Sequence, residues 1–325
     1  MSVNYCLDDL SIKGFLDTSS NPSSDICELA DLVEEIICFG ESVAVPDCVD
    51  SYSIGKNLLF QDVYSFDFSH GDTQFGIDRD KWMRLFILRG KLENIAVNAA
   101  LEVTVCDKSG VCSRTKSLSD TATIVNSKTK NGEPFSILAM GCASLKPGEH
   151  EYHIDNESCK EIYVLLSRDD IPANTRWLIQ KLQLPEDGFF SLWSRAFPSL
   201  LKSDDLSFRR FNGGYNLLRD EVIRHLSFLN DHFINLWQQC NMDFPCFVRR
   251  AKSEYSIDFS NESSNTRKSP QKMRQRKAMF ACKSVNCEIH TKINPTINRI
   301  HIHPPKPEIG GEKILIGIFV DHLET

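Results

Sequence analysis

The segment CEIHTKINPTINRIHIHPP, residues 287–305, contains two short runs in which polar and apolar residues alternate. Alternate side chains of a β-strand lie on the same face, so each run predicts a strand with one polar and one apolar face. The four residues between the runs, NPTI at 294–297, are typical of a loop that turns the chain back. The segment therefore predicts an antiparallel β-hairpin.

A four-residue loop also predicts the register of this hairpin. The cross-strand pairs are then His290 with His301, Lys292 with Arg299, and Glu288 with His303, and all six side chains lie on one polar face. Directly opposite side chains have Cβ atoms about 4.5–5.5 Å apart, and like charges at that distance are destabilising. Because Lys292 faces Arg299, the hairpin favours a negatively charged ligand.

A phosphate group suits this face. Arginine offers a two-pronged hydrogen-bond donor and lysine a compact cation, while a neutral and a protonated histidine can act as base and acid in phosphodiester cleavage. In RNA the ribose 2′-hydroxyl supplies the nucleophile, so this mechanism requires no metal or other cofactor. We predict that His290 and His301 exchange the roles of base and acid, while the two cations stabilise the transition state. His303 or Glu288 orients one of the histidines.

Two other interpretations of the histidines stay open. They can be solvated side chains on the surface of a sheet, without a catalytic role. Alternatively, His290, His301 and His303 can give three imidazoles to Zn²⁺ and leave a fourth position open, as catalytic zinc sites do. Cys282 and Cys287 with His290 form a further zinc pattern, although Cys287 and His290 lie on opposite faces of a regular strand.

A second group of cations precedes the hairpin. The segment SNTRKSPQKMRQRK, residues 264–277, has no acidic residue and contains six cations: Arg267, Lys268, Lys272, Arg274, Arg276 and Lys277. Such a segment is typical of a polyanion-binding surface or of a solvated tether. On the first interpretation these six residues contact nucleic acid.

The 325-residue chain has a net charge of −7, but this charge is unevenly divided. Residues 207–325 contain 18 lysines and arginines against 12 acidic residues, a balance of +6, whereas residues 1–206 contain 19 against 32, a balance of −13. A chain of this length has room for two domains. We predict an acidic domain at 1–206 that senses, regulates or binds a protein partner, and a basic domain at 207–325 that binds RNA or another phosphate-bearing ligand.

Hydrophobic periodicity predicts a mixed helix and strand domain in residues 1–206. Apolar residues recur at helical spacing in DICELADLVEEIICFG, and alternate in IAVNAALEVTV, residues 95–105. Further strands are expected at 83–89, 121–126, 135–140 and 161–167, and helices at about 172–183 and 187–196. We expect this domain to be built around an antiparallel sheet.

Residues 207–325 predict a long helix followed by a small antiparallel sheet. Apolar side chains recur at steps of three or four through 216–239, which indicates a helix with one broad apolar face. Strands are expected at 286–293, 298–303 and 313–320, with a further one at 279–283. The last run, ILIGIFV, is typical of a central strand covered on both faces. The whole chain therefore predicts the α+β class.

Several common chemistries have no support in the sequence. It contains no phosphate-binding loop, dinucleotide-binding fingerprint or nucleophile elbow. The apolar run at 314–320 is far shorter than the roughly 20 residues of a membrane helix, so we expect no membrane association. The twelve cysteines are scattered without a C-x-x-C pair, which is typical of reduced thiols in a cytoplasmic protein. His70, His150 and His153 are best explained as surface residues.

The C-terminal part also resembles known bacterial proteins. A long helix, a basic segment and an antiparallel sheet with Lys, Arg and His on one face resemble the element order of RelE-type toxins, which are ribonucleases that cut messenger RNA. The run from FNGGYNLL through HTK, NRIHIHPP and ILIGIFVDHL resembles an uncharacterised group of bacterial proteins associated with mobile-element and phage-defence loci. These resemblances cover about 110 residues and imply a bacterial cytosolic setting.

The resulting hypothesis is an RNA-binding protein with metal-independent endoribonuclease activity, acting as a toxin or a phage-defence effector. The alternative is a non-enzymatic component of a defence system that binds nucleic acid or protein. A zinc-dependent hydrolase is the third hypothesis.

Overall fold

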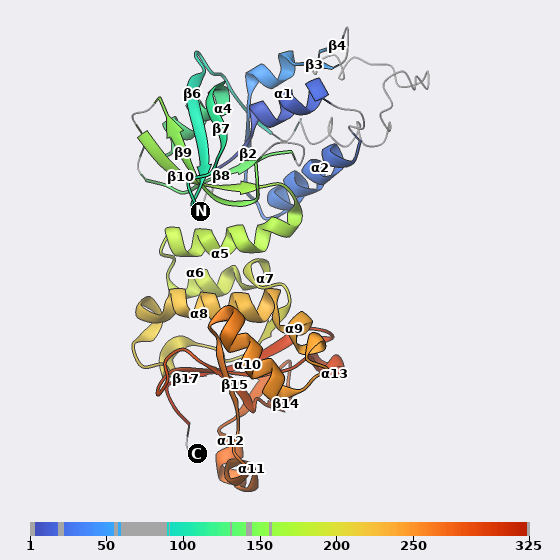
Figure 1. Cartoon of the computed structure of the whole chain (residues 1–325). Coiled ribbons are helices and arrows are strands. Elements are labelled where there is room, and N and C mark those ends of the chain that lie inside the picture. The colour runs from blue at the N-terminus through green and yellow to red at the C-terminus, as the bar shows by residue number, and fades with distance from the viewer. Residues whose placement is uncertain are drawn as a thin grey trace. The chain divides into compact units, whose positions relative to one another are not determined.

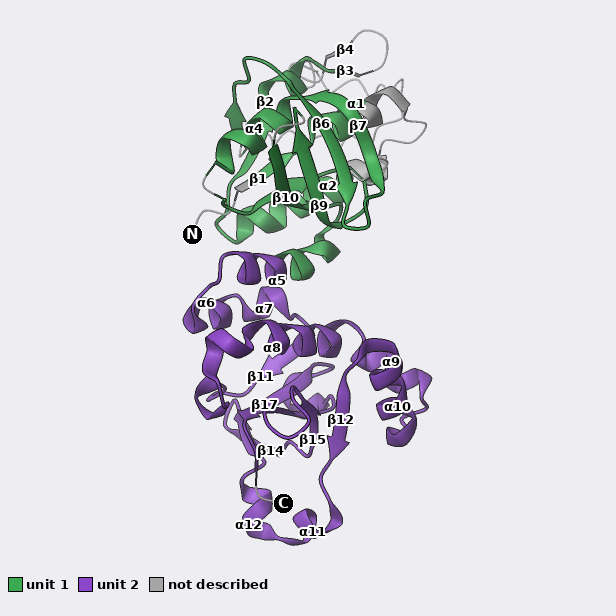
Figure 2. Ribbon diagram, turned by 60° about the vertical axis from the view of Figure 1, so that its left-hand side comes forward, with its two compact units in different colours: residues 1–174 green, residues 175–325 purple. Residues whose placement is uncertain are grey.

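The computed structural model describes most of the chain, namely residues 4–18, 23–54, 58–59, 90, 92–130, 132–140, 145–155 and 158–323. The chain divides into two compact units, residues 1–174 and 175–325 (Figure 2). Both units combine helices with a sheet that is wholly or partly antiparallel, so the expected α+β class is confirmed. His70 and the expected strand at 83–89 lie outside the described residues.

Unit 1 contains an eight-stranded mixed sheet with the order β5-β2-β1-β8-β10-β9-β6-β7 (Figure 1). Its strands are β1 (Asn4–Leu7), β2 (Val43–Pro46), β5 (Glu93–Ile95), β6 (Leu101–Asp107), β7 (Cys112–Ser119), β8 (Phe135–Leu138), β9 (Gly148–Ile154) and β10 (Ser158–Leu165). Neighbours from β5 to β10 in this order are parallel, and those from β10 to β7 are antiparallel. Strands β8 and β10 were expected at 135–140 and 161–167, but their parallel pairing was not, because short strands that are buried throughout, such as β2 and β8, show no alternation.

One helix of unit 1 lies where a strand was expected. The helices of this unit are α1 (Asp9–Thr18), α2 (Ser23–Cys38) and α4 (Asp120–Lys128), with the 3-10 helices η1 (Asp47–Ser51) and η5 (Arg168–Asp170) and a separate strand pair of β3 (Ser53–Ile54) and β4 (Leu58–Leu59). The expected helix in DICELADLVEEIICFG is confirmed as α2. The expected strand at 121–126 is wrong, because Ser119 accepts a hydrogen bond from the Ala122 backbone N–H at 3.1 Å and begins α4 there. The β-branched residues of this stretch suggest a strand, but the cap begins a helix.

Unit 2 contains a five-stranded sheet with the order β11-β17-β16-β15-β12. Its strands are β11 (Leu200–Lys202), β12 (Asp258–Asn261), β15 (Ile289–Lys292), β16 (Arg299–His303) and β17 (Ile314–Val320). A separate hairpin is formed by β13 (Lys277–Phe280) and β14 (Lys283–Asn286). Only the β11–β17 pair of the larger sheet is parallel, so the expected small antiparallel sheet is confirmed.

Helices pack on one face of this sheet. They are α5 (Ile171–Lys181), which crosses the boundary between the units, α6 (Glu186–Ser191), α7 (Trp193–Ala196), η6 (Phe208–Arg210), α8 (Gly214–Asp231), α9 (Phe233–Gln239) and α10 (Phe244–Tyr255). Three short helices lie outside this layer: α11 (Ser264–Lys268), α12 (Pro270–Arg274) and α13 (Pro307–Gly310), of which α13 packs through Ile309 against the core on the other face. One core joins Leu226 and Phe247 from the helices to Phe259 and Ile300 from the strands. The long helix expected at 216–239 is present as α8 and α9, which are separated at His232.

The other face of the sheet is covered in part by the β13–β14 hairpin. Phe280 and Val285 of the hairpin share a second core with Leu315 and Ile318 of β17. All seven residues of β17 are buried, which confirms the expected central strand covered on both faces. Gly317 permits this close packing, because a Cβ atom there would overlap the sulfur of Cys287.

The boundary between the units lies earlier in the chain than the expected boundary at 206/207. Residues 175–206 belong to unit 2. Phe189, Trp193 and Phe197 pack in the same core as the strands of unit 2, and β11 pairs with β17. The charge balance does not reveal this boundary, because the buried side chains that decide it are uncharged.

Candidate functional site

The hairpin of β15 and β16 has the predicted register. His290 pairs with His301 and Lys292 pairs with Arg299, as expected from the four-residue loop. The ladder ends at the pair formed by Ile289 and its partner Ile302, so Glu288 and His303 lie beyond it. The β12 strand pairs with the other edge of β15 and extends the same polar face.

The paired histidines are buried. The exposed fraction is 8% for His290 and 1% for His301, and their ring centroids lie 4.9 Å apart. The interpretation as solvated surface histidines therefore does not hold for this pair. Burial follows from the chain that continues beyond β12 through α11 and α12, which supplies Glu262 and Arg276 to the same side of the sheet.

Glu262 and Arg276 form a buried ion pair beside the histidines. Arg276 Nε lies 2.9 Å from Glu262 Oε1, and its Nη2 donates to Oε2 at 3.1 Å. Their side chains are only 1% and 4% exposed. Arg276 Nη1 also donates to the backbone oxygen of Lys272 at 2.8 Å. Arg276 therefore differs from the exposed, nucleic-acid-binding cation that the sequence analysis expected.

Both histidines are neutral in this environment. Burial, followed by the positive charges of Arg299, Lys292 and Arg276, lowers the pKa of His290 to about 3. Burial, followed by the neighbouring His290, holds the pKa of His301 well below its usual value. At neutral pH each imidazole can accept a proton or a metal ion, but neither carries a proton to donate as a charged acid.

Hydrogen bonding distinguishes the ring nitrogens of His301. In the neutral ring, Nδ1–H donates to the backbone oxygen of Cys287 at 3.1 Å. This leaves Nε2 with its lone pair, and Nε2 is buried without a hydrogen-bond partner among the described residues. Nδ1 of His290 is likewise buried without such a partner there, and lies 3.7 Å from Glu262 Oε1.

These side chains line a cavity of about 220 Å³. Six titratable residues face it: Glu262, Arg276, His290, Lys292, Arg299 and His301. The Lys292 ammonium is 4.0 Å from Asp258, which also contacts Lys252 at 3.6 Å, so this carboxylate is shared. Partial burial lowers the pKa of Arg299, which nevertheless stays charged at neutral pH.

Glu288 and His303 face a different, larger cavity of about 620 Å³. Glu288 is ion-paired with Arg267 at 2.7 Å, and the ring of His303 contacts the backbone oxygen of Pro304 at 2.6 Å. The expected six-residue face is therefore divided between two cavities. The alternative zinc set of His290, His301 and His303 is not brought together, and Glu262 takes the third place in the cluster of possible ligands.

The basic segment forms two short helices instead of a tether. Ser263 and Ser269 cap α11 and α12 through their side chains. Four of the expected nucleic-acid-binding cations are exposed: Arg267, Lys268, Arg274 and Lys277. Lys272 is partly buried, and two of the exposed residues, Arg267 and Lys277, line the larger cavity.

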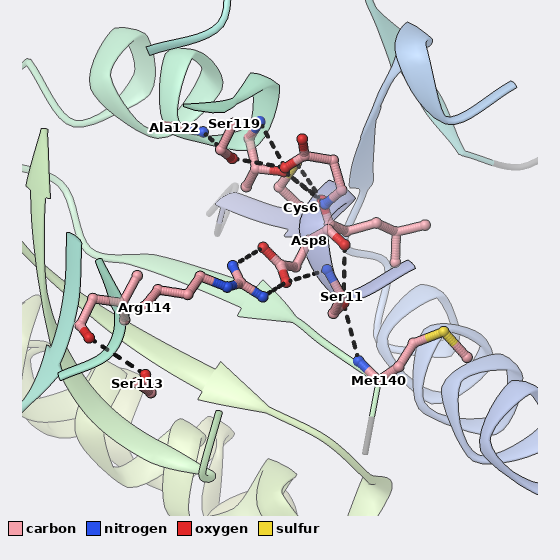
Figure 3. A network of polar contacts seen from close by, with 12 residues as sticks. Cys6, Asp8, Ser11, Ser113, Arg114, Ser119, Ala122 and Met140 are labelled. Atoms are coloured by element: carbon pink, nitrogen blue, oxygen red, sulfur yellow. Dashed lines mark hydrogen bonds and ion pairs between the residues drawn. The ribbon is translucent and has the colours of Figure 1, made fainter. Parts of the chain in front are cut away.

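Unit 1 offers a second candidate at the carboxyl end of β1, where ligands often bind in sheets with parallel strands. Asp8 forms two contacts with Arg114, at 2.7 and 2.5 Å, and accepts a hydrogen bond from the Ser11 backbone at 2.9 Å (Figure 3). Asp9 accepts from Ser119 Oγ at 2.7 Å. These carboxylates are bound to other parts of the unit, so the network explains how β1, α1 and α4 are held together.

Two expectations about unit 1 concern histidines and cysteines. His150 is buried, with Nε2 at 2.8 Å from the backbone oxygen of Lys146, so its expected surface position is wrong. His153 is partly exposed and lies 3.2 Å from Glu151. Cys106 and Cys112 form a disulfide, which the sequence analysis did not expect.

The hairpin cavity is thus the stronger candidate, because it joins neutral imidazoles to charged side chains in one cavity. Among the described residues, no helix combines the length and the apolar character needed to cross a membrane. Comparison of the chain with protein-family models, curated proteins and solved structures finds no match.

Proposed function

We propose that unit 2 binds the phosphate groups of RNA in the cavity between β12 and the hairpin of β15 and β16. The carrying observation is the convergence of Lys292 and Arg299 at paired positions on the cavity wall. Glu262 is the single carboxylate among the cavity's described lining residues, and its charge is matched by Arg276. Lys292 shares the Asp258 carboxylate with Lys252, so Lys292 and Arg299 leave the cavity wall with an excess of positive charge that a phosphate would balance.

The larger cavity supports a polymeric ligand over a single phosphate ion. Asn261 lines both cavities, so the two lie next to each other. Arg267, Lys277 and Lys306 line the larger one, although Arg267 is paired with Glu288. A chain of phosphates that passes from one cavity to the other would meet several cations in succession.

The lowered pKa values of the two histidines favour binding over metal-independent cleavage. Exchange of base and acid roles requires that one imidazole be protonated at the working pH. Burial and the neighbouring cations oppose protonation of both His290 and His301. We therefore place RNA binding first, and this conclusion favours the non-enzymatic alternative over the predicted ribonuclease.

The biological setting that we propose rests on the sequence resemblances. They support a bacterial cytoplasmic protein in a mobile-element or phage-defence context, and they also support RNA as the phosphate-bearing polymer. A protein partner for the acidic part of the chain stays a prediction.

The proposal is tested by fluorescence anisotropy with a labelled single-stranded RNA and the full-length protein. Two variants, Lys292→Gln and Arg299→Gln, each remove one cation from the cavity wall. The matched control is Lys313→Gln, because Lys313 is exposed and lies before the start of β17, at the opposite end of that strand from the partner of Arg299. Single-stranded DNA of the same sequence and inorganic phosphate serve as competitors.

We expect each cavity variant to weaken RNA binding by about 10- to 100-fold, since a hydrogen bond to a charged group contributes about 1.5–3 kcal/mol. The control should bind as the unmodified protein does. Equal loss in all three variants would indicate non-specific attraction to positive charge. Unchanged binding in both cavity variants would exclude this cavity as the RNA site.

A further inference from the structure

The proposed RNA site does not use two buried nitrogens of the same cavity. Nδ1 of His290 and Nε2 of His301 have no hydrogen-bond partner among the described residues. A buried polar atom without a partner costs about 1–3 kcal/mol. Two such atoms on facing rings therefore point to a ligand that the imidazole lone pairs bind directly.

We propose that Glu262, His290 and His301 form a binding site for a divalent transition-metal ion of the Zn²⁺ type. Each residue offers one ligand atom, and the three atoms lie within 4.8 Å of one another. Two imidazoles and a carboxylate are a known ligand set for catalytic zinc, and they leave a further position for water or substrate. This inference goes beyond the proposed RNA binding and does not depend on it.

One of the three distances between ligand atoms is close to that in a zinc site. Two ligand atoms of a tetrahedral zinc site lie about 3.4 Å apart when each is about 2.1 Å from the metal. His290 Nδ1 lies 3.7 Å from Glu262 Oε1, so a movement of a few tenths of an ångström would bring this pair to the required distance. The two rings belong to paired positions of adjacent strands, which limits how far they can move apart.

The surrounding contacts resemble those that orient metal ligands. Metal-binding histidines usually donate their second ring N–H to a carboxylate or a backbone carbonyl, and ligating carboxylates are themselves hydrogen-bonded. His301 donates from Nδ1 to the backbone oxygen of Cys287 at 3.1 Å, which leaves the lone pair of Nε2 without a hydrogen-bond partner among the described residues. Arg276 holds the Glu262 carboxylate in position.

The positive charges near the site determine which further ligand a bound metal ion would need. Arg276 already balances Glu262, and Lys292 and Arg299 add two further charges to the wall. A dication in this field needs an anion on its open position. A hydroxide or a phosphate oxygen would supply this anion, so phosphate should strengthen metal binding. This effect of phosphate on metal binding rests on the proposed function, whereas the set of metal ligands does not.

Calorimetric titration of the chelator-treated full-length protein with Zn²⁺ tests the ligand set. We expect one Zn²⁺ per chain, and at least a 100-fold loss of affinity in His301→Ala. His303→Ala is the matched control, because His303 lies two residues away on the same strand but faces the other cavity. Equal Zn²⁺ affinity in His301→Ala and His303→Ala would overturn the proposal, as would the absence of Zn²⁺ binding in the unmodified protein.

X-ray absorption spectroscopy of the zinc-bound, unmodified protein decides the question even if His301→Ala does not fold. We expect two imidazoles and oxygen ligands, with no sulfur. Two other candidate clusters occur among the described residues, Glu151 with His153 and Cys159, and Asp9 with Cys48 and Asp120, and each contains a cysteine. A sulfur ligand would therefore overturn the proposed site and point to one of those clusters.

The outcomes for metal and RNA can be separated. Lys292→Gln should weaken RNA binding without weakening Zn²⁺ binding, because the lysine is no ligand and its charge repels the ion. His301→Ala should lose Zn²⁺, while the two wall cations that carry the RNA proposal remain. The RNA-binding proposal and the metal-binding proposal can therefore be confirmed or contradicted independently.

Discussion

Replacement of Arg276 by methionine should strongly destabilise unit 2. The guanidinium is 1% exposed and its partner Glu262 is 4% exposed, with contacts of 2.9 and 3.1 Å between them. Methionine has a similar length but no charge, so Arg276→Met leaves the Glu262 carboxylate buried without its partner. Removal of one member of a buried ion pair typically costs about 3–5 kcal/mol in the free energy of unfolding.

The companion variants separate the ion pair from other effects of the substitution. Glu262→Gln should also destabilise unit 2, because it leaves the arginine charge buried. The double variant should be more stable than the sum of the two single losses implies, since no unpaired charge remains. The difference between that sum and the measured value is the coupling energy of the pair.

Urea denaturation followed by tryptophan fluorescence measures these changes. Three of the four tryptophans, Trp177, Trp193 and Trp237, lie in unit 2, so the signal reports mainly on its unfolding. A loss below about 1 kcal/mol in Arg276→Met would refute the reasoning, because such a value is typical of an exposed ion pair. Arg276 would then be the solvated cation that the sequence analysis expected.

Two further predictions concern other parts of unit 2. His225 is buried, contacts Thr291 and has its pKa lowered to about 3, chiefly by burial and then by Arg224. The unfolded chain therefore binds a proton below pH 6.5 that the folded chain does not bind until about pH 3. His225 alone should lower stability by up to about 5 kcal/mol as the pH drops through this window. Denaturation of His225→Gln at several pH values should therefore show a smaller fall in stability than the unmodified protein, and an equal fall would contradict this assignment. Gly317→Ala should destabilise unit 2 by about 1–3 kcal/mol through overlap with Cys287, and Cys287→Ala should restore part of that loss; no restoration in the double variant would mean that the overlap is not the cause.

Local patterns were sufficient to predict the hairpin. The alternation of polar and apolar residues identifies its two strands, and the four-residue loop gives the pairs His290 with His301 and Lys292 with Arg299. Both features depend on residues close together in sequence. The same holds for α2 and for β17, whose periodicity extends over most of the element.

Glu262, which lies beside His290 and His301, could not be predicted from local sequence patterns. Glu262 comes beside the histidines because β12 pairs with β15, and that pairing joins segments about 30 residues apart. The apolar residues Ile257 and Phe259 alternate with polar ones in IDFS and weakly indicate a strand there. No local feature, however, indicates which edge of the sheet that strand joins.

The burial of Arg276 was hidden for a similar reason. It lies within a run of exposed cations, and composition does not distinguish it from its neighbours. Its position is decided by the buried carboxylate that it meets, which belongs to the segment after β12. The burial that makes His290 and His301 neutral has the same tertiary origin.

The most direct test of RNA binding at this cavity is an NMR titration of the metal-free, full-length protein with single-stranded RNA. The nine histidines are labelled, and variants at 290, 301 and 303 assign the relevant signals. We predict that RNA shifts the imidazole signals of His290 and His301 and leaves that of His153 in unit 1 unchanged. If the signals of His290 and His301 stay unchanged at saturating RNA, the ligand binds elsewhere and the central claim is contradicted.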